Sequence, residues 1–230
     1  VTNIGTHTFY GCSSITSIII GNGVTSIKNS AFSNCPSLIS ITLPDDLASI
    51  GVSAFSQCIS LTSIAIPDSV TSIETWAFSY CTSLKKITIP DSVTNIGNYA
   101  FWECPLTYNV YDNAYYLGNK SNPYLVLVKA KRDDIASCSI NNNTKFIHSS
   151  AFQNCTSLTS ITIPDGVTSI GDSAFRHCSS LTSVTIPDSV TDIGEYTFEY
   201  CHALKSVTIG NSVTNIGTHT FYGCSSITSI

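Results

Sequence analysis

Charged side chains are scarce in this chain: they make up 11% of its 230 residues, which is about half the usual share in soluble proteins. Only 10 residues are Lys or Arg, and the net charge is −5. The nearest approach to a basic cluster is Lys129, Lys131 and Arg132, and it is followed at once by Asp133 and Asp134. A protein that binds nucleic acid or an anionic membrane needs a basic surface, so we expect neither partner.

Long apolar runs and catalytic motifs are also missing. No run approaches the roughly 18 apolar residues of a transmembrane helix, so no membrane insertion is predicted. The first residues, VTNIGTHTF, do not resemble a signal peptide. The chain contains no C-x-x-C, H-E-x-x-H or G-x-S-x-G motif, and no P-loop or G-x-G-x-x-G. These absences predict a protein that is not an enzyme and holds neither a cofactor nor a metal.

What the chain does contain is a repeat. Cys12, Cys35, Cys58, Cys81 and Cys104 are spaced by 23 residues, and so are the four cysteines from Cys155 to Cys224. A Phe lies three residues before each of these nine cysteines. The step from Cys104 to Cys155 is 51 residues, which is two repeats with five extra residues. Such periods are typical of solenoids, in which stacked units cover one another's apolar faces.

One unit, residues 158–178, indicates the shape of a rung. Alternating apolar residues predict a short strand over 158–163, which Pro164 ends because proline cannot donate to a continuing ladder. Residues 172–178 then suggest one helical or 3₁₀ turn that buries Ala174 and Phe175. Stacking about ten such rungs would form one parallel sheet along one side, roughly 45–50 Å long.

The consensus L-x-x-I-x-I-P-x-x-V-x-x-I-G-x-x-A-F-x-x-C resembles the BspA-type (Treponema pallidum-type) leucine-rich repeat. PDSV recurs at 67–70, 90–93 and 187–190, and the resemblance covers nearly the whole chain apart from about 105–134. The position of the Asn found in commoner leucine-rich repeats holds Ser or Gly here, as at Gly166 and Ser189. The resemblance implies a leucine-rich-repeat solenoid that is secreted or displayed at a cell surface of bacteria or protozoa and serves in adhesion.

We therefore predict a single solenoid domain over residues 1–230 with one irregular insert at about 105–134. Within the insert, runs at 113–117 and 124–129 flank the turn-rich segment 118–123, which predicts a β-hairpin that replaces the convex half of one rung. Tyrosines gather in and beside it: Tyr108, Tyr111, Tyr115, Tyr116 and Tyr124. They either pack the hairpin onto the solenoid or contact a partner.

Two sets of residues are the candidate partner contacts. In the hairpin they are Tyr111, Tyr115, Tyr116 and Tyr124, with Tyr115 and Tyr116 on opposite faces of one strand. On the outward strand face, a ladder of hydroxyls includes Thr88, Thr162, Thr185 and Thr208. An ice-binding surface is an alternative for this ladder, although Ala65 and Lys86 interrupt it.

The in-phase cysteines and aspartates also have two interpretations each. Nine cysteines in one register are expected to be buried free thiols, because parallel side chains aim wrongly for disulfides. The Asp of each Pro-Asp pair is expected to accept backbone N–H groups at a turn. A Ca²⁺-binding acidic ladder is the alternative for these residues, which are Asp45, Asp68, Asp91, Asp165 and Asp188.

The two ends of the chain match. Residues 1–18 are identical to residues 213–230, which suggests duplication of a block of rungs, and neither end carries a polar capping repeat. End-to-end self-association is therefore expected. Two functions stay open: a surface scaffold that binds a protein or glycoprotein, and a structural rod or filament element.

Overall fold

The computed structural model describes residues 1–230 and contains 20 short strands joined by turns, without a helix. The chain divides into two compact units, Val1–Thr107 and Tyr108–Ile230, and each is described by itself. The single domain over residues 1–230 stays a prediction. No helix is present that could cross a membrane.

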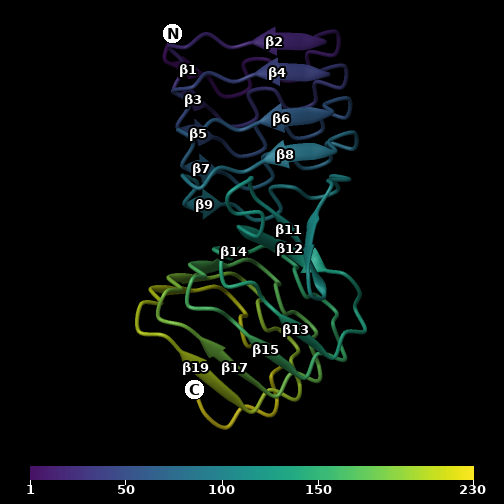
Figure 1. Ribbon diagram of the computed structural model, residues 1–230, viewed down its shortest axis with the longest axis vertical. Coiled ribbons are helices and arrows are strands. Elements are labelled where there is room, and N and C mark those ends of the chain that lie inside the picture. The colour runs from purple at the N-terminus through teal and green to yellow at the C-terminus, as the bar shows by residue number, and fades with distance from the viewer. The chain divides into compact units, whose positions relative to one another are not determined.

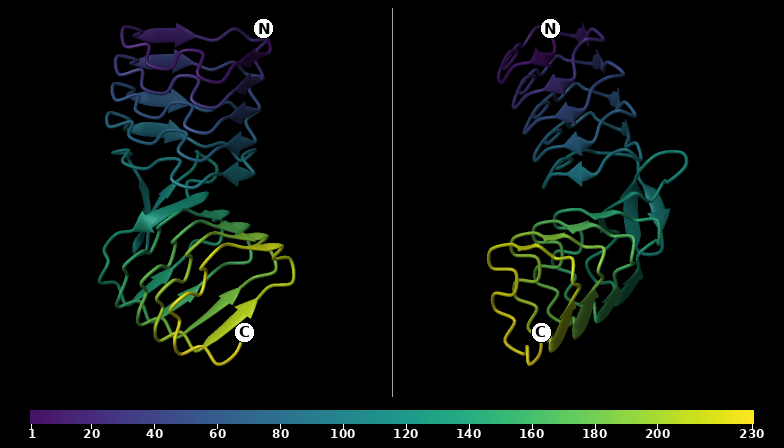
Figure 2. Two further views of the ribbon diagram at one scale, coloured as in Figure 1. Left: turned by 180° about the vertical axis from the view of Figure 1, so that it is seen from behind. Right: turned by 90° about the vertical axis from the view of Figure 1, so that its left-hand side faces the viewer.

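Unit 1 is a coil in which each rung contributes two strands (Figures 1 and 2). The longer first strands are β2 (Ser17–Ile19), β4 (Ser40–Thr42), β6 (Ser63–Ala65) and β8 (Lys86–Thr88). The two-residue second strands are β1 (Asn3–Ile4), β3 (Ser26–Ile27), β5 (Ser49–Ile50), β7 (Ser72–Ile73) and β9 (Asn95–Ile96). The second strands form one continuous parallel ladder, whereas the first strands pair only as β2 with β4 and β6 with β8.

Unit 2 repeats this plan. Its first strands are β13 (Ser137–Ser139), β15 (Ser160–Thr162), β17 (Ser183–Ile186) and β19 (Ser206–Ile209). Its second strands are β14 (Phe146–Ile147), β16 (Ser169–Ile170), β18 (Asp192–Ile193) and β20 (Asn215–Ile216). Three further strands precede them: β10 (Asn109–Tyr111), β11 (Ala114–Leu117) and β12 (Val126–Ala130).

The strand predicted at 158–163 is confirmed as β15, and the solenoid fold is confirmed with it. The expectation of one sheet was too simple, because a second strand such as β16 follows in every regular rung. A strand of two residues is too short to show an alternating apolar pattern in the sequence. It forms because the neighbouring rungs offer hydrogen-bond partners in register, as Ile147, Ile170 and Ile193 do.

The prediction of a helical or 3₁₀ segment at 172–178 was wrong. The N–H groups of Ser173 and Phe175 donate to Glu195 and Thr197 of the next rung, both at 2.8 Å, while Ala174 closes a turn within its own rung. Ser173 has a φ of 57°, which interrupts any helix. Every non-glycine residue with positive φ except Asp112 lies at such a turn position. The turns are therefore a second set of contacts between rungs.

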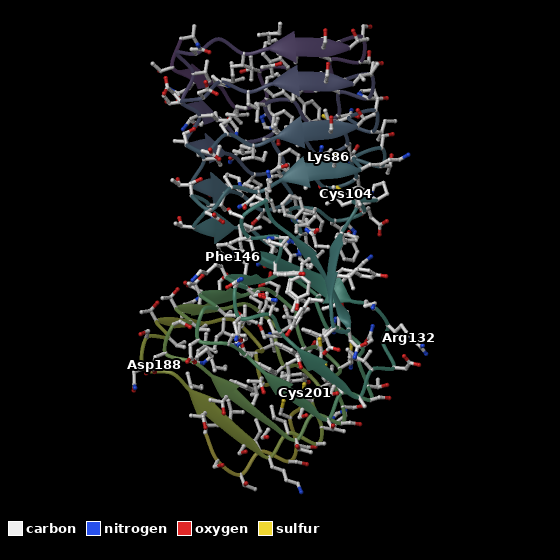
Figure 3. All side chains as sticks on the ribbon, viewed as in Figure 1. Lys86, Cys104, Arg132, Phe146, Asp188 and Cys201 are labelled. Atoms are coloured by element: carbon white, nitrogen blue, oxygen red, sulfur yellow. The ribbon has the colours of Figure 1, made fainter.

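The core of each unit is built on stacked phenylalanines. In unit 2, Phe175 is 0% exposed and lies between the rings of Phe152 and Phe198, each at 5.2 Å. The cysteine of each rung sits beside this stack: the thiol of Cys178 donates to the Phe152 carbonyl at 3.2 Å. Figure 3 shows the same inward position for Cys201, while Asp188 and Arg132 point outward. The in-phase cysteines are thus core residues, as expected, and only Cys12 and Cys224 are partly exposed.

The predicted hairpin is confirmed as β11 and β12, and a third strand, β10, extends it through a turn at Asp112 and Asn113. β12 pairs in parallel with β14, so it takes the place of a second strand. The turn reaches the first-strand ladder as well: Asp112 Oδ2 accepts the Ser139 N–H at 2.6 Å, and Asn113 Nδ2 donates to the Ser137 carbonyl. The hairpin therefore covers both ladders at the start of unit 2 and acts as a cap.

Candidate binding site

The hairpin turns one face to the core and presents the other to solvent. Tyr116 is 0% exposed and packs in the core of unit 2. Burial raises the pKa of its hydroxyl, which accepts the Asn141 N–H at 3.4 Å. The preceding residue in the strand, Tyr115, lies on the opposite face and is only half buried. The predicted alternation is thus confirmed, and Tyr116 is a core residue in this fold.

A row of aromatic and basic side chains crosses the outer face. Tyr115 and Lys129 are direct partners across β11 and β12, so their side chains project to the same side. The rings of Tyr108 and Tyr115 lie 5.4 Å apart. The ammonium of Lys129 lies 5.4 Å from the centre of the Tyr108 ring, in cation–π contact.

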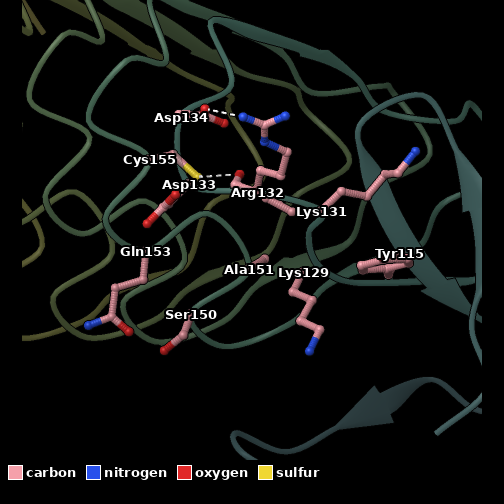
Figure 4. Close-up of a pocket in the computed structure, with 11 residues that line it drawn as sticks. Tyr115, Lys129, Lys131, Arg132, Asp133, Asp134, Ser150, Ala151, Gln153 and Cys155 are labelled. Carbon is pink, nitrogen blue, oxygen red and sulfur yellow. Dashed lines mark hydrogen bonds and ion pairs between the residues drawn. The ribbon is translucent and has the colours of Figure 1, made fainter.

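This row borders a pocket of about 600 Å³, which we call the hairpin pocket. The segment after β12 and the turn of the following rung complete it; the lining residues are Tyr115, Lys129, Ala130, Lys131, Arg132, Asp133, Asp134, Ser150, Ala151, Gln153 and Cys155. Figure 4 shows the ring of Tyr115 and the ammonium ends of Lys129 and Lys131 on one side, with Asp133 and Cys155 on the other.

The charges of the hairpin pocket are unevenly compensated. Arg132 forms an ion pair with Asp134, and this hydrogen bond raises the pKa of the guanidinium. Lys131 donates to the Asp112 carbonyl at 3.2 Å, but no ion pair joins Lys129 or Lys131 to a carboxylate. The pocket therefore offers two ammonium groups beside a tyrosine ring, which suits a ligand with both an anionic and an apolar part.

The only thiol of the hairpin pocket is unsuited to nucleophilic chemistry. Burial raises the pKa of Cys155 to about 12, with further contributions from Asp133 and Cys138. At neutral pH this thiol is protonated, whereas a cysteine nucleophile needs a lowered pKa. The arrangement can hold a ligand, but this thiol does not provide an activated nucleophile.

The hydroxyl ladder borders a second hollow, of about 730 Å³, on the first strands of unit 2. Thr162, Thr185, Asp165 and Asp188 line this strand-face hollow, which shares no residue with the hairpin pocket. It lies where the ladder is open, because β15 pairs with β13 and β17 with β19. Asp188 Oδ1 also accepts the Asn211 N–H of the next rung at 2.7 Å, as its turn position predicts.

The remaining candidate residues are dispersed. Tyr111 is 39% exposed on β10, and its ring contacts those of Tyr116 and Tyr124. Tyr124 is half buried against the core of unit 2. Thr208 is exposed beside Thr185 in the β17–β19 pair, and Thr88 is exposed on β8 of unit 1.

Residues that the sequence did not single out complete the hairpin pocket. Ser150 and Gln153 join the hairpin pocket from the rung that follows the cap, and nothing in their own repeat position marks them. A third feature lies in unit 1, where aromatic side chains gather on the turns. The signal for it was available: the chain has only two tryptophans, Trp76 and Trp102, and they occur in adjacent repeats.

Comparison with known proteins assigns the family. The model of the BspA type leucine rich repeat region matches residues 2–121 and 130–230. The chain therefore belongs to the BspA-type leucine-rich-repeat proteins, as its consensus suggested. The interruption at 122–129 falls within the hairpin. None of the curated protein sequences matches the chain.

Among solved structures, the chain is similar to a leucine-rich repeat protein of Bacteroides ovatus, with 27% identity and a TM-score of 0.50, over 97% of this chain and 68% of that one. One from Eubacterium ventriosum has 27% identity and a TM-score of 0.49, over 100% and 63%. A leucine rich cell surface protein of Faecalibacterium prausnitzii has 30% identity and a TM-score of 0.43, over 100% and 76%. These relatives are longer than the chain.

Proposed function

We propose that the chain is a non-catalytic scaffold at a cell surface that binds a protein or glycoprotein in adhesion, with the hairpin pocket as its contact site. The pocket itself is the observation that carries the proposal. The regular rungs are explained by stacking and the hairpin by capping, but neither role requires Lys129 and Lys131 to line a pocket beside Tyr115 without an ion pair to a carboxylate. The relative from Faecalibacterium prausnitzii, described as a cell surface protein, supports the location.

The test measures binding of the purified chain to immobilised fibronectin, laminin and collagen by surface plasmon resonance. We expect binding to at least one of them, and we expect the double variant Tyr115→Ala/Lys129→Gln to bind at least about tenfold more weakly, a loss of about 1.4 kcal/mol. Lys120→Gln is the matched control, because Lys120 is exposed in the same hairpin but does not line the pocket.

Two results would contradict the proposal. Absence of binding to all three proteins would remove the matrix-adhesion role. Binding that is equal in the double variant and in Lys120→Gln would exclude the hairpin pocket and would direct attention to Thr162 and Thr185 in the strand-face hollow. Circular dichroism of each variant shows whether the fold is intact.

A further inference from the structure

Unit 1 carries a group of aromatic side chains on the turns of its last two regular rungs. The rings of Trp76 and Tyr99 are stacked at 4.6 Å with an interplanar angle of 17°. Trp102 meets Tyr99 edge to face at 5.5 Å and 85°. Tyr80 is joined to Trp102 through the backbone, since the Tyr80 N–H donates to the Trp102 carbonyl at 2.8 Å. We call these four residues the aromatic cluster.

The aromatic cluster lies outside the stacked core of unit 1. Trp102 is 37% exposed and Tyr80 is 44% exposed, while the stacked core of the same rungs is supplied by Phe78 and Phe101. The two preceding rungs of unit 1 form the same turns with Ser30, Asn34, Ser53 and Gln57 at these positions, whereas the first rung has His7 and unit 2 has Tyr196 and Tyr200 there.

Two residues of the aromatic cluster stand at left-handed backbone positions. Trp76 and Tyr99 have φ values of 60° and 58°. In this left-handed region Asn and Asp are favoured, whereas bulky residues are outliers that recur at functional sites. Large rings therefore stand in unit 1 at positions where Ser30 and Ser53 form the same turn.

The surroundings define the ligand. The aromatic cluster lies in a stretch with few cations: between residues 29 and 119 only Lys85 and Lys86 are basic. Glu103, the exposed neighbour of Trp102, adds a negative charge and a hydrogen-bond acceptor. Ring faces attract the slightly positive C–H groups of an apolar surface, and the Tyr80 hydroxyl and the Glu103 carboxylate are available to sugar hydroxyls.

From these observations we propose that the aromatic cluster is a binding site for a neutral pyranose sugar. A pyranose combines an apolar C–H face with peripheral hydroxyls, which matches rings bordered by the Tyr80 hydroxyl and the Glu103 carboxylate. A protein partner would need about 800 Å² of contact surface, and the Ser, Asn and Gln of the neighbouring turns do not extend the apolar area. This site is independent of the hairpin pocket and of the function proposed for it.

Tryptophan fluorescence tests the proposal directly, because both tryptophans of the chain belong to the cluster. The probes are galactose, glucose, N-acetylglucosamine and their disaccharides lactose, cellobiose and chitobiose. N-acetylneuraminic acid is the charged comparator, and sorbitol controls for solvent effects. We expect a saturable change with at least one neutral sugar, at a Kd of about 1 mM, and weaker binding of the acid.

Variants assign the binding to the cluster, with affinities read by calorimetry because Trp102→Ala removes part of the fluorescence. Trp102→Ala should weaken binding at least about tenfold, and Trp102→Tyr should restore part of it. Tyr10→Ala is the matched control: Tyr10 follows its Phe as Trp102 does and is 55% exposed. It should bind like the parent chain.

The proposal is overturned if no sugar produces a saturable change, or if Trp102→Ala binds as tightly as the parent. Tighter binding of N-acetylneuraminic acid than of the neutral sugars would refute the assignment to neutral ligands. Loss of binding to a matrix protein in Trp102→Ala, without any response to sugar, would show that the cluster contacts protein instead.

Discussion

Replacing Phe175 with Ala tests the stacked core most directly. The ring is 0% exposed and lies between two nearly parallel rings, with interplanar angles of 6° to Phe152 and 1° to Phe198. Truncating a buried Phe costs about 3–5 kcal/mol, and contacts between aromatic rings are worth about 0.5–1.5 kcal/mol each beyond the buried area. Because Phe175 loses two such contacts, we expect a loss of about 4–5 kcal/mol in the free energy of unfolding.

Phe221 is the matched comparison within the same unit. It occupies the same repeat position, but it is only partly buried and contacts a single ring, Phe198, at 5.5 Å. Its replacement by Ala should cost about 1–2 kcal/mol, since less area and one aromatic contact are lost. The difference between the two variants depends on the stack and not on the type of residue removed.

The assay is urea unfolding followed by circular dichroism, with the slope m compared between variants. Tryptophan fluorescence is recorded in parallel because both tryptophans lie in unit 1, so the two signals report whether unit 1 unfolds in the same transition. A loss below about 1 kcal/mol for Phe175→Ala would refute the stacked core, since buried aromatics cost several times more. Equal losses for Phe175→Ala and Phe221→Ala would refute the role of the second ring contact.

Three further outcomes are expected. Titration with a thiol reagent should modify at most Cys12 and Cys224 quickly in the native chain and all 10 cysteines after denaturation without reductant; near-zero thiols in the denatured chain would show that they are oxidised. Burial lowers the pKa of His148 from 6.5 to about 4, so the neutral form is favoured in the folded state and stability is full above about pH 6.5 and declines toward pH 4, by about 3 kcal/mol. His148→Gln should remove that decline in urea melts, and an unchanged pH profile would contradict the assignment. In Gly118→Ala the new Cβ would lie 2.0 Å from the Asn122 carbonyl oxygen, so the hairpin loop must shift and the melting temperature should fall; an unchanged melting temperature would show that the loop adapts freely.

The sequence predicted the features that recur. The 23-residue period, the Phe and Cys register and the β15 strand are all visible in local patterns, because every rung must bury the same apolar positions. The hairpin was also predictable, since strand-like runs stand on either side of a turn-rich segment. β10 was missed because its three residues, Asn109–Tyr111, are all exposed and therefore show no alternation.

The site was only partly predictable for a related reason. Tyr115 and Tyr116 were known to point in opposite directions, but which of them enters the core depends on how β12 docks against β14. Ser150 and Gln153 come to the hairpin pocket from a rung that follows the cap, so their contribution is set by stacking. The openings between first strands, such as that between β15 and β17, likewise depend on how successive rungs pair.

By itself, then, the sequence determined that this chain is a BspA-type solenoid with one inserted hairpin, because a buried position must be apolar in every rung and the repeat displays those positions. The tertiary structure decided the features that have no local signature in the sequence. The two-residue strands and the left-handed turns at Ser173 and its equivalents exist because the adjacent rung supplies their hydrogen-bond partners. The same stacking brings Ser150 and Gln153 to the hairpin pocket and Trp76 beside Tyr99, combinations that no single repeat contains.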